Sequence, residues 1–265
     1  MTRLNSGEKF VGASSLAAIL SMSASLPVAH AQDNQDNPFY GPGDGDSFEA
    51  RWTGISVGVG GGFNFFTGSP RLDVYESFTP YTDSEIFDFD SNGIFGTAEI
   101  GFDKAFNKRW VAGVYADVSV GNVSESYGFS DDDSDKDIDY AATIKFKEKY
   151  SLIARLGYEV SQRTLLYGLA GYSLQKYEAY VSQSVDSYFD SSDTSDGFMG
   201  AAIVGAGVET LLSKRTSLKL EYRFSHANGI DVDTSEVEDG YLYWADFDTG
   251  NINTHTVRGV MSFKF

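Results

Sequence analysis

Several residue types are scarce in this 265-residue sequence, and each scarcity excludes a class of protein. There is no cysteine, so no disulfide framework supports the fold. Lysine and arginine number only 20 against 38 acidic residues. A chain with a net charge of −18 is repelled by phosphate groups and does not bind nucleic acid electrostatically. Only five residues are proline while 15% are aromatic, which favours sheet over helix.

Long apolar runs are also scarce, and the one clear run lies at the start. Basic Arg3 and Lys9 precede the apolar or small residues 11–26, and Pro27-Val28-Ala29-His30-Ala31 precedes polar Gln32. This order predicts a secretory signal peptide over residues 1–31, cleaved near Ala31. The alternative, a membrane-anchoring helix, is interrupted by serines and a proline. With no second helical span evident, the exported chain is either soluble or crosses a membrane as strands.

Residues 32–50 are rich in glycine, proline and aspartate and are expected to form a flexible periplasmic lead-in. The remaining residues, 51–265, are a suitable length for one all-β domain. Eight segments within it alternate apolar and polar residues, at 52–65, 92–103, 110–120, 147–159, 164–177, 197–211, 216–226 and 256–265.

The breaks between these segments alternate in length. Long breaks at 66–90, 122–146, 179–196 and 227–251 alternate with short ones at 104–108, 161–163 and 213–215. This pattern predicts an all-β fold, an eight-stranded antiparallel up-and-down transmembrane β-barrel with four long outer loops and three short periplasmic turns. A soluble eight-stranded barrel has the same periodicity with its faces reversed. The signal peptide, the small glycines on the charged faces and the aromatics near strand ends favour the membrane barrel.

If lipid surrounds the barrel, the polar faces of the strands must fill its interior. Eight strands leave room only for side chains, so we expect the interior charges to pair with one another as a plug. An ion path along them, as in a narrow channel, is the alternative. The expected interior charge network comprises Glu99, Asp117, Arg155, Glu159, Lys219, Glu221, Arg223, Arg258 and Lys264.

The last predicted strand, 256–265, should pair with the first and close the barrel. Its apolar face carries Val257, Met261, Phe263 and Phe265, whereas Arg258 and Lys264 lie on the other face. We expect the apolar face to contact lipid and Phe265 to act as an assembly signal.

Charge is sorted by the ends of the predicted barrel. The four long breaks contain 24 of the 38 acidic residues and three basic residues, whereas the short turns are basic. The densest acidic run, 131–139, lacks the glycine and glutamate of an EF-hand loop, so we expect a solvated acidic loop and no metal or other cofactor.

The two histidines after the signal peptide are His226 and His255. The segment 224–230 faintly resembles the H-x-S-N motif of outer-membrane lipid A deacylases, which makes a lipid hydrolase the alternative function. However, Ser225 and His226 are adjacent in a predicted strand, so their side chains point to opposite faces and cannot act as nucleophile and base. We expect no catalytic residues and no enzymatic activity.

Several motifs resemble the opacity-protein-like family of small, porin-like outer-membrane barrels of Gram-negative bacteria. They are Trp52-Thr53-Gly54, Leu166-Tyr167-Gly168, Ala170-Gly171-Tyr172, Leu218-Lys219-Leu220-Glu221-Tyr222-Arg223 and Phe265. The resemblance covers about residues 52–265. It implies location in the cell outer membrane, and as partners outer-membrane lipids, lipopolysaccharide, the outer-membrane assembly machinery and a host or cell-surface ligand. The expected function is non-enzymatic: envelope integrity, with acidic surface loops for adhesion or ligand binding.

Overall fold

The computed structural model describes residues 47–265, apart from residues 70, 77–80, 87–88, 134–135, 186–188, 230, 239–240 and 249. The expected signal peptide and most of the expected lead-in therefore lie outside the described residues. In the part of the chain that is described, no helix is both long and apolar enough to cross a membrane.

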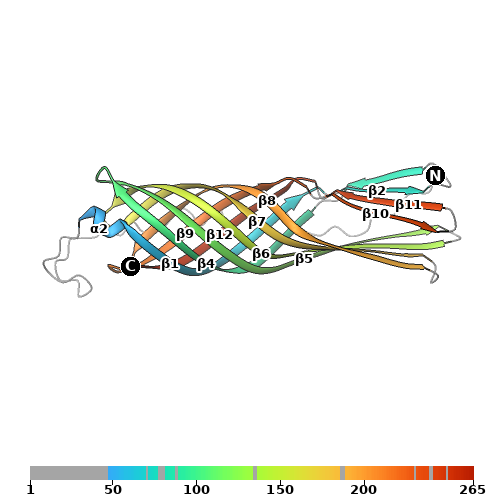
Figure 1. Ribbon diagram of the computed structural model, residues 1–265, viewed down its shortest axis with the longest axis horizontal. Coiled ribbons are helices and arrows are strands. Elements are labelled where there is room, and N and C mark those ends of the chain that lie inside the picture. Colours follow the sequence, from blue (N-terminus) through green and yellow to red (C-terminus); the bar gives the residue numbers. More distant parts are fainter. Residues whose placement is uncertain are drawn as a thin grey trace. The chain divides into compact units, whose positions relative to one another are not determined.

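Eight antiparallel strands close into a barrel (Figure 1), so the predicted fold class is confirmed. Around the barrel the order is β1-β12-β9-β8-β7-β6-β5-β4. The predicted closure is present, because Val57 in the first strand pairs with Phe263 in the last. The strands are β1 (Gly54–Gly68), β4 (Phe89–Phe106), β5 (Trp110–Asp133), β6 (Lys136–Ser161), β7 (Thr164–Val185), β8 (Phe189–Leu211), β9 (Thr216–Ala227) and β12 (Ile252–Lys264).

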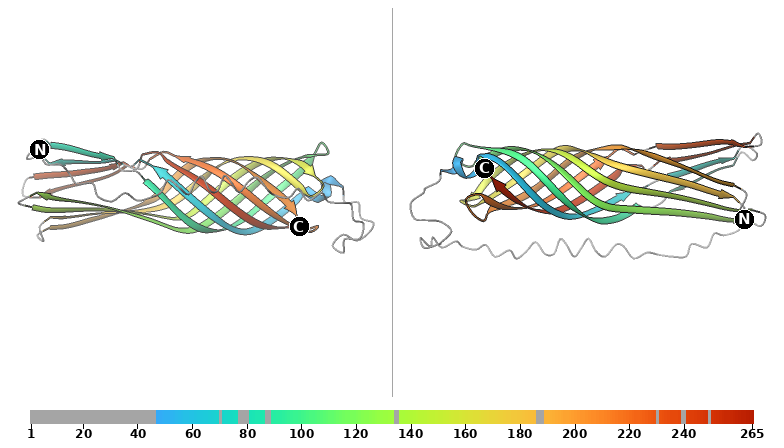
Figure 2. Two further views of the ribbon diagram at one scale, coloured as in Figure 1. Left: turned by 180° about the vertical axis from the view of Figure 1, so that it is seen from behind. Right: turned by 60° about the horizontal axis from the view of Figure 1, so that its bottom comes forward.

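One end of the barrel, called here the turn end, carries the three short connections β4–β5, β6–β7 and β8–β9. In the first of these, Asn107 and Lys108 have positive φ angles of 48° and 64°, the backbone that a tight hairpin between twisted strands requires. A short helix, α2 (Phe48–Trp52), lies at this end together with the C-terminus (Figure 2). The last residues of the expected irregular lead-in are thus helical, and the first strand begins at Gly54 instead of Trp52.

At the opposite end, called the extended end, four strands continue past the closed part of the barrel. The β4–β5 ladder stops at Phe95 and Gly121, but the β5–β6 ladder runs on to Asp133. Likewise the β8–β9 ladder stops at Ala201, whereas β7 and β8 remain paired up to Val185. Beyond the closed part, β5 to β8 therefore form an open sheet.

A second sheet is formed by the segments between β1 and β4 and between β9 and β12. Its order is β10-β11-β2-β3, with β2 (Arg71–Glu76), β3 (Tyr81–Ile86), β10 (Asp231–Glu238) and β11 (Tyr241–Asp248). The four segments expected as long loops do join strands at one end, but they are strands over much of their length. Their acidic, serine-rich composition conceals this, because a hairpin ladder is held by backbone hydrogen bonds whatever the side chains.

The two faces of the barrel wall differ in the way that a membrane requires. Leu152 is 61% exposed on the outside, whereas Arg258 is 2% exposed and Lys219 1% exposed within. A soluble barrel would bury its apolar face and expose its charges. The soluble alternative is therefore wrong, because in this barrel the exposed band is apolar and the lumen is charged.

Glycine allows β1 and β12 to approach closely where the barrel closes. A Cβ atom at Gly60 would lie 2.0 Å from the carbonyl oxygen of Gly259 across the seam. By contrast, a Cβ at Gly96 in β4 would meet no atom within 4 Å. Glycine at position 60 therefore allows β1 to lie this close to β12.

Candidate functional site

The barrel lumen holds two groups of buried ion pairs. The first, the Arg155 cluster, comprises Arg155, Asp103 and Glu209. The Arg155 guanidinium donates to both carboxylate oxygens of Asp103, over 3.0 and 2.8 Å, and its Nη1 lies 2.6 Å from Glu209 Oε2. Each of the three side chains is 2–3% exposed. One cation thus connects β4, β6 and β8 through the interior.

The second group, the Arg258 cluster, contains three carboxylates and three cations. Arg258 Nε donates to Glu221 Oε2 over 2.6 Å, and its Nη2 donates to Glu99 Oε2 over 2.7 Å. Lys219 donates to the other oxygen of Glu99 over 2.7 Å. The positive and negative charges of the cluster are equal in number, and nearly all polar atoms of these side chains form hydrogen bonds or ion pairs. The cluster can therefore be stable in an interior that excludes water. Its members are Glu99, Asp117, Lys219, Glu221, Arg223 and Arg258.

Two buried tyrosines connect the two clusters. The Tyr115 hydroxyl donates to Asp103, while the Lys219 ammonium lies 4.1 Å from the centre of the Tyr115 ring. Tyr167 donates to Glu221 over 2.8 Å, and the Arg155 guanidinium lies 4.7 Å from its ring centre. The faces of the two aromatic rings therefore contact cations, and the tyrosine hydroxyls bond carboxylates of both clusters, so the two clusters are joined through the tyrosines.

Helix α2 closes the turn end of the lumen. Ser47 caps the helix by accepting a hydrogen bond from the amide of Ala50. The fully buried Trp52 donates its indole N–H to Glu159 over 3.1 Å, and Arg51 lies 3.0 Å from the same carboxylate oxygen. Apolar side chains pack with Trp52 as a continuous layer, among them Val111, Leu165, Ile203 and Leu211.

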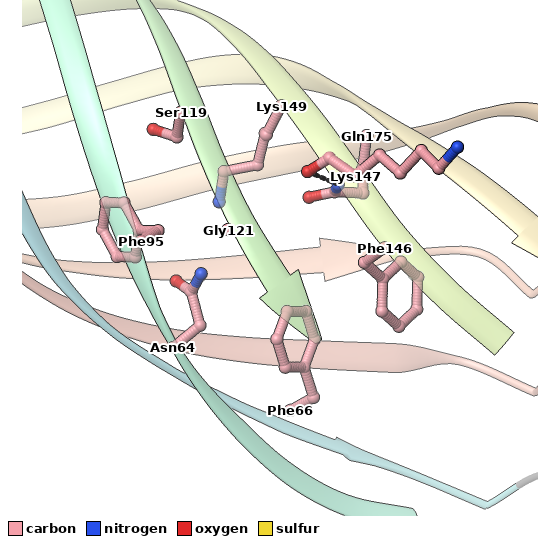
Figure 3. A pocket seen from close by; sticks show the side chains of 9 residues that line it. All are labelled: Asn64, Phe66, Phe95, Ser119, Gly121, Phe146, Lys147, Lys149 and Gln175. Carbon is pink, nitrogen blue, oxygen red and sulfur yellow. Dashed lines mark hydrogen bonds between the residues drawn. The ribbon is translucent and has the colours of Figure 1, made fainter. Parts of the chain in front are cut away.

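A second apolar layer crosses the lumen toward the extended end. Phe66 of β1 and Phe146 of β6 stack with their ring centres 5.1 Å apart and their planes within 3°. The layer also contains Ile144, Ala179, Met199, Ala201, Ala227 and Ile252, all buried. The ionic clusters thus lie between two apolar layers, and side chains fill most of the lumen apart from a small pocket beside Phe146 and Lys149 (Figure 3).

The nine charged residues expected in the interior fall into three places. Six of them form the Arg258 cluster, and Arg155 is the centre of its own cluster. Glu159 and Lys264 instead lie at the turn end, where Glu159 holds α2 and Lys264 donates to the backbone oxygen of Arg51 over 3.1 Å. Phe265 is 73% exposed, and its N–H donates to the oxygen of Ile55 over 2.9 Å.

Two members of the Arg155 cluster, Asp103 and Glu209, and the connecting tyrosines, Tyr115 and Tyr167, are not in that expectation. Asp103 and Tyr115 share the parity of the expected residues on their own strands, whereas β8 and β7, which carry Glu209 and Tyr167, have no expected member. Strand alternation alone would have found them, but Asp103 stands at the end of a predicted segment and the tyrosines resemble girdle residues in sequence.

The histidines lie on the outer surface of the barrel, as their parity predicts. His226 Nδ1 is 2.8 Å from Asn253 Oδ1, and His255 Nδ1 is 2.6 Å from the Tyr222 hydroxyl. Ser225 is 4% exposed and faces the lumen, so the barrel wall separates it from His226. Among the described residues, no three His, Asp or Glu side chains are grouped as a metal ion would require.

An ion pair between Lys147 and Glu178 lies on the outer surface toward the extended end, past Tyr150, the last exposed large apolar residue described on β6. The hydrogen bond from Lys147 lowers the pKa of Glu178, and the same bond raises the pKa of Lys147. Both groups are therefore charged at neutral pH.

Known proteins share this sequence pattern. Residues 14–265 match the family described as outer membrane protein beta-barrel domain. The 31 kDa outer-membrane immunogenic protein of Brucella melitensis is 24% identical over 227 residues, covering 81% of this chain and 84% of the relative. Among solved structures, the outer membrane protease OmpT from Escherichia coli is 12% identical with a TM-score of 0.46, covering 79% of this chain and 97% of that one.

Neisserial surface protein A is 13% identical with a TM-score of 0.40, covering 80% of this chain and 98% of that one. The family match extends over nearly the whole chain, and the closed barrel accounts for it in structural terms. The chain therefore belongs to the outer membrane protein beta-barrel family and is a bacterial outer-membrane β-barrel protein.

Proposed function

We propose that this protein is a non-enzymatic barrel that contributes to envelope integrity and presents acidic strands for adhesion or ligand binding. The packed lumen is the observation that carries this proposal. Two ionic clusters, two apolar layers and α2 occupy the space through which a solute would pass. The protein's other prominent surface is then the set of strands at the extended end, which faces outward if the barrel is oriented like others of its class.

Charge and backbone geometry support a binding role for that end. The four segments that build it contain 24 of the chain's 38 acidic residues. Within the described residues both sheets there are open, and an open sheet edge offers backbone groups that can pair with another chain. The Brucella melitensis relative is known as an immunogenic protein, and surface exposure would account for that property in that relative.

Lipids, lipopolysaccharide and the outer-membrane assembly machinery are proposed partners as well. The exposed apolar band supplies the surface for lipid contact. Export with removal of residues 1–31 is part of the same proposal.

A loop-exchange experiment tests the binding role. Replacing residues 71–86 and 231–248 by short Gly-Asn turns should remove the second sheet and leave the barrel, whose ladders do not involve these residues. Cells displaying the shortened protein should lose adhesion to host cells or matrix that the full chain confers, while heat-modifiable mobility on gels persists. Equal adhesion by both proteins would contradict the proposal.

Two measurements separate the alternative functions. Steady single-channel openings of the purified protein in planar bilayers would indicate a narrow channel and contradict a packed lumen. Release of fatty acid from lipid A by the wild-type protein, lost on His226→Ala or His255→Ala substitution, would establish the hydrolase. We expect neither, because both histidines are bonded on the outer wall and Ser225, the neighbour of His226 in sequence, faces inward.

A further inference from the structure

The turn end of the barrel carries an excess of positive charge. The segments at its three short connections, residues 104–109, 161–163 and 213–215, contain six basic residues and no acidic one. All six side chains are exposed, so the connections present cations to whatever lies beside the turn end. These residues are Lys104, Lys108, Arg109, Arg163, Lys214 and Arg215.

The acidic residues near this end do not cancel that charge. Asp103, Glu159 and Glu209 are buried in the lumen, where each forms an ion pair with an arginine. Among the described side chains, this leaves Glu49 of α2 as the exposed carboxylate at the turn end. Six exposed cations therefore face one exposed anion, and the surface is strongly cationic.

Arg109 has a defined position on the outer wall at this end. Its Nη1 donates to the Tyr158 hydroxyl over 3.2 Å, and its guanidinium carbon lies 5.8 Å from the centre of the Tyr158 ring. Trp110 packs edge-on against the same tyrosine, with ring centres 5.2 Å apart and planes at 69°. The guanidinium is thus held beside a pair of packed aromatic rings.

Within the part of the chain that the structure describes, Arg109 bonds no carboxylate. Its side chain has one hydrogen-bond partner there, the uncharged Tyr158 hydroxyl. A guanidinium has five N–H donors in a planar fork that fits the oxygens of a phosphate. Most donors of Arg109 are therefore left for a ligand. Lys104 and Lys108, in the same segment, add positive charge and form no ion pair with a described residue.

The depth of Arg109 is set by its neighbours on the wall. Trp110 of β5 pairs with Tyr158 of β6, which pairs in turn with Leu166 of β7, and all three side chains are exposed on the outer wall. Tryptophan and tyrosine gather at the headgroup level of a membrane. Exposed apolar side chains continue along the strands from this row, such as Leu156 on β6. Arg109 therefore lies at the level of lipid phosphates, where the apolar band meets the turn end.

The sign of the surface selects among phospholipids. A zwitterionic headgroup brings a cation together with its phosphate, and the three connections contain no acidic residue that could receive this cation. An anionic headgroup, such as that of phosphatidylglycerol, offers the phosphate without a cation. Basic side chains near a membrane surface are attracted to anionic lipids for this reason.

We propose that Arg109, with Trp110 and Tyr158, binds the phosphate of an anionic phospholipid in the leaflet at the turn end. The guanidinium donates to the phosphate oxygens, Lys104 and Lys108 supply further positive charge, and the acyl chains lie along the apolar wall. This leaflet faces the periplasm if the barrel is oriented like others of its class. The inference rests on the proposed contact with membrane lipids and does not depend on adhesion by the extended end.

Quenching of tryptophan emission by brominated lipid measures the preference, because Trp110 adjoins Arg109. The full chain is refolded into mixed vesicles of phosphatidylcholine and phosphatidylglycerol, with bromine on the acyl chains of one lipid or the other. Both leaflets have the same composition, so the direction of insertion does not matter. Trp110→Phe identifies the part of the quenching that arises at this site.

We expect phosphatidylglycerol to be preferred about fivefold beside Trp110 at low ionic strength, the effect of one basic residue near anionic headgroups. Arg109→Gln should reduce the preference to about one. Arg215→Gln is the matched control, since it removes the same charge from the same end. Its strand, β9, lies four positions from β5 in the eight-stranded order, on the opposite side of the barrel. This variant should keep the wild-type preference.

Heat-modifiable gel mobility verifies that each variant is folded. Equal quenching of the wild type by the two brominated lipids would overturn the proposal. Equal loss of preference in Arg109→Gln and Arg215→Gln would also overturn it, because the attraction would then come from net charge and not from a site. Both results would leave the proposed lipid contact standing, whereas failure of the chain to insert into vesicles of any composition would contradict that contact itself.

Discussion

Arg155 gives the most direct test of the lumen as a charge-balanced plug. Its guanidinium bonds Asp103 over 2.8 and 3.0 Å and Glu209 over 2.6 Å, with all three side chains 2–3% exposed. Arg155→Met keeps most of the side-chain volume but leaves two buried carboxylates without their shared cation. Breaking a buried ion pair from one side costs about 3–5 kcal/mol. Because two anions are affected, we expect a loss near the upper limit of that range.

Guanidinium-induced unfolding in phospholipid vesicles, followed through tryptophan emission, measures this loss. Arg215→Met, on the exposed β8–β9 turn, is the matched control and should change the free energy of unfolding by no more than about 0.5 kcal/mol. Adding Asp103→Asn and Glu209→Gln to Arg155→Met should recover much of the stability, because no uncompensated charge then remains. A loss of only about 1 kcal/mol for Arg155→Met, as for an exposed pair, would refute the reasoning.

Three further predictions concern the seam, the outer surface and the turn end. Gly60→Ala should cost about 1–3 kcal/mol in the same assay because its Cβ meets a backbone oxygen, whereas Gly96→Ala should cost little; equal effects would contradict the close approach. The pKa of Glu178, followed by NMR of its carboxyl carbon, should lie below the ordinary glutamate range, and Lys147→Met should raise it. Because the pKa of Glu178 is lower in the folded state, the ion pair stabilises the fold at pH values above the unfolded-state pKa. That stabilisation should disappear as the pH falls through the folded-state pKa. Lys108→Gly should stabilise the barrel by about 1 kcal/mol by relieving a positive φ, and a loss of stability would exclude that strain.

Alternation predicted the faces of the barrel strands correctly because the side-chain period in a strand is two. Leu220 and Tyr222 are exposed and Lys219 and Glu221 buried, as parity requires. Which face meets lipid is not encoded in the period itself, so composition and the signal peptide had to decide it. The same argument placed His226 and Ser225 on opposite sides of the wall.

The partners within the lumen could not be predicted from the sequence. Arg258 of β12 reaches over β1 to Glu99 of β4 because strand tilt and register place the two side chains at one level, and neither quantity follows from periodicity. The position of Lys149 depends on a register shift that no residue type announces. The sheet β10-β11-β2-β3 was concealed for a different reason, since acidic and serine-rich segments resemble loops in composition.

The connectivity of the Arg258 cluster has a consequence for how the barrel assembles. Glu99 bonds Lys219 and Arg258, which follow it by 120 and 159 residues. The cluster becomes neutral only when β4, β5, β9 and β12 are all in place, so a half-assembled sheet would carry unpaired charges toward the membrane interior. Pairing of β1 with β12 and neutralisation of the lumen charges should therefore occur together, and contacts so distant in sequence should make this event slow. The interior charges would thus favour membrane insertion of completed barrels over that of partly assembled sheets.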